Sequence, residues 1–297
     1  MTSVSGSPGD HASRSGPTRE APDRPARKQP AQHGPAPAGP AQAGPGRGKS
    51  AQSRPARPDA DTALFTRWAH DYAAGRPGQQ LTVLLAGAVT AASDLGLAGL
   101  RDSGTDISVW LIDDDQPVTR AAIASQPALV QCTLGDLRTV ALPQRSFDIV
   151  ACTLLLDRIE HAELVLDRLT GALKPGGLLL LQVRDRDCAA ALLDRALPSR
   201  LRGAIWRQRR PGRPGPHPAI YDRLGTARGI QSYALLRGLV IAARQPLGGL
   251  AGGLPQAPRG YLAAQKMIAR FSGRLTASHE ELLYVLRKPE DPFARLL

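Results

Sequence analysis

Short, continuously apolar runs alternate along this chain with segments in which apolar residues recur every three or four positions. Runs of the first kind predict strands that helices cover on both faces, because a solvent-exposed face would place a polar residue at every second position. The second pattern is typical of amphipathic helices. The predicted strands span 81–87, 107–113, 129–133, 147–153, 178–185 and 281–288.

Helical segments separate the strands, so the chain consists of repeated strand–helix–strand units. This alternation predicts an α/β fold built on a doubly wound, mainly parallel sheet. Helices are predicted at about 63–75, 88–100, 118–125, 162–173, 189–197 and 261–271, with a helix followed by a strand in 229–244. An Arg/Pro/Gly-rich connection at 211–218 and a Gly-rich break at 248–253 interrupt the last third.

The first of these helices has the clearest amphipathic pattern. Leu64, Trp68 and Tyr72 stand four residues apart, which places them on one helical face. Asp61 or Thr62 is suited to cap its first turn.

Residues 1–58 differ in composition from the rest of the chain. Pro, Ala, Gly, Ser and Arg dominate, and aromatic residues are absent. Such a segment cannot bury enough apolar area to offset the entropy of ordering, so we expect a disordered tail before a single domain at 59–297. The tail is either a solvated segment or a weak binding element for nucleic acid or an acidic partner.

The chain carries a net charge of +12, and its first 58 residues hold nine lysines and arginines against three acidic residues. The rest is therefore only moderately basic, and nucleic acid is a possible but not a favoured partner. Cys132, Cys152 and Cys188 lack the spacing of a zinc site or a disulfide framework, so we expect no metal. No apolar signal core or membrane-length run occurs, which predicts a soluble, cytoplasmic protein.

A ligand site is expected where the central strands end. In a doubly wound sheet the ligand lies beyond the carboxyl ends of the strands, which here places 86–90, 113–115, 135–137 and 152–155 around one crevice. Asp113 ends the second strand, where a carboxylate can accept two hydrogen bonds from a ribose diol. The alternative is a solvated loop whose acidic residues favour the next helix N-terminus.

Asp136 directly follows the third strand. Its carboxylate, beside the backbone N–H of Leu137, can read the amino group and ring nitrogen of an adenine. The alternative is an Asx-turn residue, which uses the same side chain to close its own loop.

The segment 135–177 resembles the class I S-adenosylmethionine-dependent methyltransferases, specifically their type 11 group. It contains Gly-Asp, Leu-Pro, Ser-Phe-Asp before the fourth strand and Leu-Lys-Pro-Gly-Gly before the fifth, in the family's order and spacing. The resemblance is good over 62–184 and weak as far as Lys288. It implies a seven-stranded Rossmann-like sheet with an antiparallel strand near the C-terminus, and S-adenosyl-L-methionine as the cofactor.

The resemblance further implies methyl transfer to an undetermined acceptor, expected to be a small molecule. The aromatic residue of the leading helix often covers the cofactor in this family, which nominates Tyr72. The cofactor-binding residues implied in this way are Tyr72, Ala86, Gly87, Ala88, Asp113, Asp114, Asp136, Leu137, Cys152 and Thr153.

The first loop departs from the family pattern of an acidic residue followed by Gly-x-Gly-x-Gly. Gly87 matches the first glycine, but Val89 and Ala91 replace the later two, and Leu85 stands at the acidic position. A β-branched residue is unfavourable at positive φ and takes up space near the cofactor. Either this loop follows another backbone path and still binds the cofactor, or the domain is a non-catalytic scaffold or regulatory protein.

The sequence shows no dedicated catalytic group, and methyl transfer needs mainly positioning and at most a base. His161 is the weak candidate for that base; the alternative is a helix-capping or surface residue. Cys152 is expected to be a core residue. The region 195–228 holds nine arginines against one acidic residue and corresponds to the acceptor lid of the family, which suits an anionic acceptor, unless its arginines are simply solvated.

Two other functions fit part of the sequence. The Arg-rich segments suit a nucleic-acid-binding protein. Gly87 and Asp113 would also serve a dinucleotide-dependent oxidoreductase, although that class does not account for Gly-Asp, Ser-Phe-Asp and Lys-Pro-Gly-Gly.

Overall fold

The computed structural model of the chain describes residues 60–87, 97–124, 131–209, 215, 218–248 and 259–290. All of them belong to one compact unit, Ser53–Leu297, and a second unit comprises Met1–Gln52. The predicted tail at 1–58 lies outside the described residues and stays a prediction.

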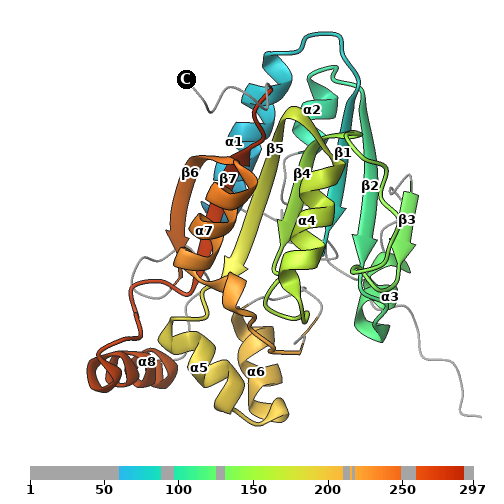
Figure 1. Cartoon of the computed structure of the whole chain (residues 1–297). Helices are drawn as coiled ribbons and strands as arrows, with labels where there is room; N and C mark the ends of the chain where they lie inside the picture. The colour runs from blue at the N-terminus through green and yellow to red at the C-terminus, as the bar shows by residue number, and fades with distance from the viewer. Residues whose placement is uncertain are drawn as a thin grey trace, which may run out of the picture. The chain divides into compact units, whose positions relative to one another are not determined.

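Seven strands form one mixed sheet in the order β3-β2-β1-β4-β5-β7-β6 (Figure 1). β7 is antiparallel to both neighbours, whereas β1 to β5 pair in parallel. The predicted sheet, with its antiparallel strand near the C-terminus, is therefore confirmed. The strands are β1 (Leu81–Ala86), β2 (Ile107–Asp113), β3 (Gln131–Leu134), β4 (Phe147–Thr153), β5 (Leu173–Arg184), β6 (Val240–Leu247) and β7 (Glu281–Arg287).

Helices separate the strands nearly as the sequence pattern predicts. They are α1 (Ala60–Ala74), α2 (Leu97–Asp102), α3 (Pro117–Ala124), α4 (Ala162–Ala172), α5 (Ala189–Ala196), α6 (Ser199–Arg209), α7 (Ala227–Arg237) and α8 (Arg259–Ser272), with the short 3-10 helix η2 (Arg223–Gly225) before α7.

Two hydrophobic cores lie on opposite faces of the sheet. Side chains alternate along a strand, so Val83 and Leu85 of β1 pack with α1 and α2, while Leu84 and Ala86 pack with α4 and α7. Figure 1 shows α4 and α7 in front of the sheet and α1 behind it. This double burial explains why the central strands are apolar at every position.

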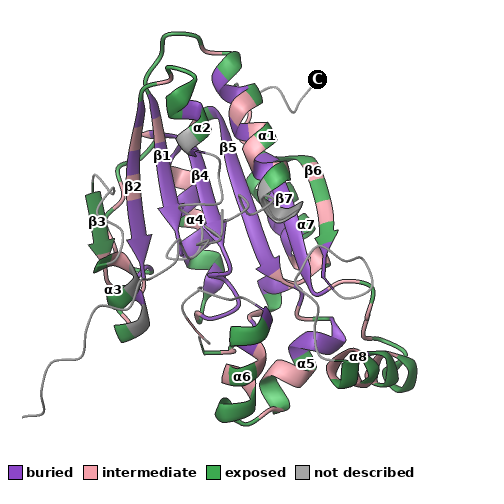
Figure 2. Ribbon diagram, turned by 180° about the vertical axis from the view of Figure 1, so that it is seen from behind, coloured by how far each residue is buried: buried purple, intermediate pink, exposed green. Residues whose placement is uncertain are grey.

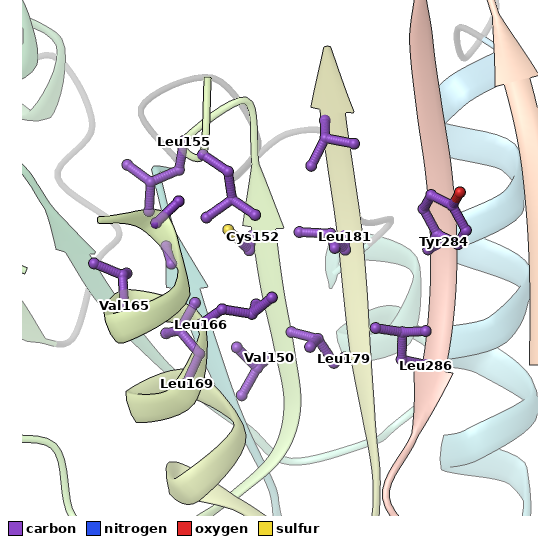
Figure 3. Close-up of a cluster of buried hydrophobic side chains, with 14 of the residues drawn as sticks. Val150, Cys152, Leu155, Val165, Leu166, Leu169, Leu179, Leu181, Tyr284 and Leu286 are labelled. Atoms are coloured by element: carbon purple, nitrogen blue, oxygen red, sulfur yellow. The ribbon is translucent and has the colours of Figure 1, made fainter. Parts of the chain in front are cut away.

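The core on the α4 side is drawn in Figure 3. Leu166 and Leu169 of α4 point toward Val150 of β4 and Leu179 of β5, and all four side chains are almost completely buried. Aliphatic residues three apart therefore fix this helix on the sheet.

Two elements differ from the sequence-based prediction. α6 is absent from it, because this Arg-rich helix buries only Trp206 and Arg209 and so lacks an apolar stripe. β5 begins at Leu173 rather than 178, because Leu173 already pairs with Phe147 of β4. Among the described residues no helix is long and apolar enough to cross a membrane.

Replacing Leu166 by Ala tests the packing of α4. The side chain is fully buried, so we expect the free energy of unfolding to fall by about 2–5 kcal/mol. Leu164→Ala, on the same helix but 54% exposed, is the control and should change it by less than about 0.5 kcal/mol. Urea denaturation measures both, and equal losses would contradict the assigned face.

Candidate functional site

An ion pair is buried at the carboxyl end of β2. Asp113 Oδ1 accepts from Nη2 of Arg158, which follows β4, and from the backbone N–H of Asp114 at 2.8 Å. The same Nη2 lies 3.3 Å from Asp114 Oδ1. Both Asp113 and Arg158 side chains are within 1% of complete burial. Asp113 Oδ2 is buried without a hydrogen-bond partner, so this oxygen can still accept one.

Burial dominates the electrostatics of Asp113 and raises the pKa of its carboxyl to about 8. The Arg158 guanidinium opposes this by favouring the charged form. Burial therefore favours the protonated carboxyl near neutral pH, and Arg158 or another polar partner favours the ionised form.

Gly87 ends β1 directly beside this pair. Its φ of +72° is a conformation that residues with a Cβ rarely adopt. A Cβ there would lie 2.8 Å from the Thr153 carbonyl oxygen, 2.9 Å from Leu155 Cβ and 3.3 Å from Arg158 Nη2. The glycine is thus required by the close approach of the β1 and β4 ends.

A cleft with a volume of about 190 Å³ opens next to the ion pair. Asp114, Asp136, Leu137 and Arg158 line it, together with Ile220 from the segment before η2. The cleft brings together residues that follow β2, β3 and β4 at the carboxyl edge of the sheet. Of the segments expected around one crevice, 113–115 and 135–137 contribute to its lining, whereas the described residues of 86–90 and 152–155 do not.

Asp136 performs the local role that the sequence left open. Its carboxylate accepts from the backbone N–H of Arg138 at 3.0 Å and pairs with the Arg138 guanidinium at 2.9 Å. Because Asp136 also lines the cleft, the turn orients this carboxylate at the mouth of the site. Its role toward adenine stays a prediction.

Tyr72 does not lie at the crevice. It is buried on α1, and its hydroxyl lies 3.5 Å from Asp148 Oδ1, at the start of β4. Asp148 also accepts from the Thr82 N–H at 2.9 Å and from Lys174 at 2.7 Å, so Tyr72 belongs to a polar cluster at the amino ends of the strands. The expectation that Tyr72 covers the cofactor is wrong, because α1 packs along the other face and toward the opposite edge.

Cys152 and Ala86 reach the crevice only at the level of the backbone. Both side chains are fully buried in the core on the α4 side, and Figure 3 shows Cys152 among Val150, Leu155 and Leu166. Burial raises the pKa of the Cys152 thiol far above its usual value. The expected core role of Cys152 is confirmed, and its side chain takes no part in the crevice.

The unusual first loop is described only in part. Leu85 is fully buried against α1 and α2, which explains an aliphatic residue where the family has an acidic one. Ala88, Val89 and Ala91 lie outside the described residues, so the backbone path of the loop stays open.

His161 begins α4 and is exposed at the surface. Its φ of 56° is left-handed, and its side chain caps no helical N–H. Nothing in this position turns the ring toward the crevice, and a role as base stays a prediction without structural support.

Sequence reasoning missed Arg158, which is central to the site. The available signal was a charged pair, Asp157 and Arg158, inside the otherwise apolar segment that follows β4. A charge in such a position is buried and therefore paired, but the sequence does not show with which residue.

A model of a family described as "Methyltransferase domain" matches residues 87–181, from Gly87 into β5. This segment of the chain therefore matches a methyltransferase family, in agreement with the resemblance of residues 135–177 to the class I S-adenosylmethionine-dependent methyltransferases. The match begins at the glycine of the crevice and spans the strand ends that carry Asp113, Asp136 and Arg158.

Curated relatives resemble part of this chain. The ubiquinone/menaquinone biosynthesis C-methyltransferases UbiE of Bordetella parapertussis and Bordetella bronchiseptica are each 30% identical over 111 residues, 36% of this chain. The matched region spans 42% of the length of these relatives, less than half.

Among solved structures, the chain is similar to an S-adenosylmethionine-dependent methyltransferase from Mesorhizobium loti. The two are 18% identical with a TM-score of 0.42, over 75% of this chain and 98% of that one. It is also similar to Haemonchus contortus phosphoethanolamine N-methyltransferase 2 in complex with S-adenosyl-L-methionine. Here the identity is 16% and the TM-score 0.44, over 77% of this chain and 52% of that one.

The residues present fit S-adenosyl-L-methionine, the cofactor of this family. Asp113 retains a buried oxygen without a partner, at the strand end where a ribose diol would need an acceptor. Gly87 leaves no side chain at the junction of β1 and β4, and the adjoining cleft has room for further ligand atoms. A ligand that binds Asp113 must also fit beside the guanidinium of Arg158.

Replacing Arg158 by Leu should destabilise the domain in a pH-dependent way. Asp113 then loses its cation, and at pH 9 we expect a loss of roughly 3–5 kcal/mol in the free energy of unfolding. The folded-state pKa of Asp113 lies above its unfolded value, so the folded protein keeps a proton that the unfolded chain releases, and stability falls as pH rises through that interval. Without Arg158 the pKa rises further, so the loss relative to wild type is larger at pH 9 than at pH 6.

Urea denaturation at the two pH values measures this difference. Adding Asp113→Asn to Arg158→Leu removes the titrating group and should abolish the extra loss at pH 9. A pH-independent loss in the single variant would contradict the coupling of the two side chains.

Gly87→Ala should lower the free energy of unfolding by more than about 1 kcal/mol, because it adds a Cβ at positive φ. The added atom also meets the Thr153 carbonyl. Gly135→Ala is the control, since its Cβ would meet nothing within 4 Å and its φ is not left-handed. Thermal or chemical denaturation of the two variants measures their stabilities. If both are equally stable, the end of β1 tolerates a side chain.

Proposed function

We propose that this protein transfers a methyl group from S-adenosyl-L-methionine to a small-molecule acceptor. The observation that carries the proposal is Asp113. A carboxylate with a buried, unpartnered oxygen stands at the end of β2, beside a cleft and within the family match. An unsatisfied buried acceptor is costly, and a ligand hydroxyl would satisfy it.

In this proposal each strand end has a separate task. Asp113 accepts hydrogen bonds from the ribose, while Asp114 and the segment Gly135–Leu137 form the wall on the adenine side. Gly87 allows the backbone to approach the cofactor. Arg158 shifts its ion pair partly to Asp114, which already lies 3.3 Å from the guanidinium, so that Asp113 can serve the ligand.

The cofactor supplies a methyl group bonded to a positively charged sulfur. A bond forms between the nucleophilic atom of the acceptor and the methyl carbon, while the carbon–sulfur bond breaks and its electron pair stays on sulfur. A proton that the acceptor loses passes to solvent or to a base. The protein contributes mainly by holding the two reactants in line and by excluding water.

The curated relatives support methyl transfer as the reaction class, since both are C-methyltransferases of ubiquinone and menaquinone biosynthesis. They do not identify the acceptor, because the match covers less than half of their length.

One observation favours a second candidate, a methyltransferase-like protein without catalysis. Arg158 already satisfies one oxygen of Asp113, and Leu85 has replaced the acidic residue of the first loop. If the buried pair cannot open, the domain would serve as a scaffold or regulator. Cofactor binding separates the two candidates.

Calorimetric titration of the full chain with S-adenosylhomocysteine, and separately with S-adenosylmethionine, tests the proposal. We expect micromolar binding to the wild type. Asp113→Asn should weaken it by about tenfold or more, since a hydrogen bond to a charged group is worth roughly 1.5–3 kcal/mol. The amide can still accept from Arg158, so this variant keeps the local fold.

Asp115→Asn is the matched control, because Asp115 is exposed and pairs with Arg120 outside the cleft. It should bind both ligands like the wild type. Absence of heat and of thermal stabilisation at millimolar ligand would refute the methyltransferase proposal and favour the scaffold.

A further inference from the structure

A second hollow lies beyond the carboxyl end of β5, where α5, α6 and α8 gather (Figure 1). Three guanidinium groups, two aromatic rings and two carboxylates line much of it: Arg184, Arg202, Arg209, Trp206, Tyr261, Asp194 and Glu281. This lining differs from that of the cofactor cleft, which contains no aromatic ring among its described residues.

Two of the three arginines are held by carboxylates. Arg184 Nη1 donates to Asp194 at 2.7 Å and to the Tyr221 hydroxyl at 3.0 Å, and its guanidinium lies 5.1 Å from the Trp206 ring centre. Arg209 Nη1 pairs with Glu280. These contacts fix both cations before any ligand arrives.

Two hydrogen-bond donors in the hollow are nevertheless unsatisfied. The Nε atoms of Arg202 and Arg209 are buried and lack a hydrogen-bond partner. Within the described part of the chain, Arg202 also has no carboxylate within ion-pair distance. Buried N–H donors without partners are rare and unfavourable, so the hollow offers two positively charged donors to an acceptor that carries oxygen atoms.

The arrangement follows from the helical repeat of α6. Arg202, Trp206 and Arg209 stand four and three residues apart, so all three lie on the same face of the helix. That face is turned to the hollow, whereas Arg207 of the same helix is exposed. The aromatic ring therefore stands between the two unsatisfied donors.

α6 is attached to the domain through this same face. Trp206 and Arg209 are its only buried residues among those described, and Figure 2 shows the rest of the helix largely exposed or half-buried. The space between the lining side chains now has a volume of about 20 Å³, room for roughly one water molecule. A ligand larger than a water molecule therefore requires the lining side chains or α6 to move apart.

The hollow adjoins the cofactor cleft through Asp157 and the segment before η2. The Asp157 carbonyl oxygen accepts from the backbone N–H groups of Ile220 and Tyr221, each at 3.0 Å. Ile220 lines the cofactor cleft, whereas Tyr221 bonds to Arg184 and Asp194 in the hollow. Neighbouring residues thus border both sites, as a transfer between two ligands requires.

We propose that this hollow is the acceptor site and that it takes a planar aromatic carboxylate. The inference rests on the proposed methyltransferase function and names its substrate class. The Arg202 guanidinium, which has a buried Nε–H without a partner, offers this donor to one oxygen of a carboxylate, and Trp206 and Tyr261 provide the faces against which an aromatic ring stacks. α6 is the lid over this site.

The test uses 1-naphthoate and its neutral counterpart 1-naphthamide, titrated calorimetrically into the full chain saturated with S-adenosylhomocysteine. We expect 1-naphthoate to bind at least about tenfold more tightly than the amide, because only the carboxylate pairs with the guanidinium groups. Equal affinities, or no binding of either compound, would overturn the assignment. If 1-naphthyl phosphate binds more tightly than 1-naphthoate, the site recognises a phosphate, and the assignment of a carboxylate ligand is overturned.

Arg202→Gln should weaken the binding of 1-naphthoate by about tenfold. Arg202→Lys should weaken it by less, because lysine keeps the positive charge but lacks the planar guanidinium group. Arg207→Gln is the matched control on the exposed face of α6 and should bind like the wild type. An unchanged affinity in Arg202→Gln would refute the role of this donor. The half-buried position of Arg202 makes unfolding of the variant unexpected, and circular dichroism checks it.

S-adenosylhomocysteine binding is measured on the same samples, so the two proposals fail separately. If all Arg202 variants bind S-adenosylhomocysteine normally but the wild type does not bind 1-naphthoate, only the acceptor site is refuted. If S-adenosylhomocysteine does not bind to the wild type, the methyltransferase function is refuted, and the acceptor assignment falls with it.

Discussion

Burial of the central strands on both faces is the constraint that organises this protein. β1, β4 and β5 contribute side chains to two cores at once, so the residues within their length are almost all apolar. Charged residues appear only where the strands begin or end. The parallel order then gathers the carboxyl-end groups along one edge, because strands that run the same way end on the same side.

Those groups form a nearly continuous chain of buried charges. Asp113 and Arg158 lie at the cofactor cleft, Asp157 follows at 3.9 Å from Arg184, and Arg184 continues to Asp194 in the second hollow. Burial raises the pKa of Asp157, which nearby Arg184 and Arg158 oppose. A ligand that changes one pair therefore acts on its neighbours, which is a physical route for the two sites to sense each other's occupancy.

The departures from the methyltransferase family pattern have local explanations. Leu85 completes the core under α1 and α2, and Gly87 is kept because the ends of β1 and β4 approach each other too closely for a Cβ. Arg158 gives Asp113 a cation in place of solvent. The carboxylate at the end of β2 is thus present, although Leu85, Val89 and Ala91 depart from the family pattern of the first loop.

The fold class, most strand positions and the edge of the sheet that carries the candidate site follow from the amino-acid sequence. Apolar runs and helical periodicity report burial directly, and the order of strands and helices then leaves few topologies. Asp113 and Asp136 could be nominated in the same way, because each directly follows a strand.

Which charged side chains pair with one another depends on the tertiary structure. Arg158 lies 45 positions from Asp113 in sequence, and no local pattern predicts their pairing. Tyr72 has the right type and helix for a cofactor contact, yet the packing of α1 turns it toward Asp148 at the other edge. α6 shows no apolar stripe, so its position over the second hollow follows from two side chains, Trp206 and Arg209, that become buried only in the assembled fold. The periodicity of apolar residues indicates which side chains are buried. The residue with which a buried charge pairs depends instead on contacts between segments far apart in the sequence, which no local pattern shows.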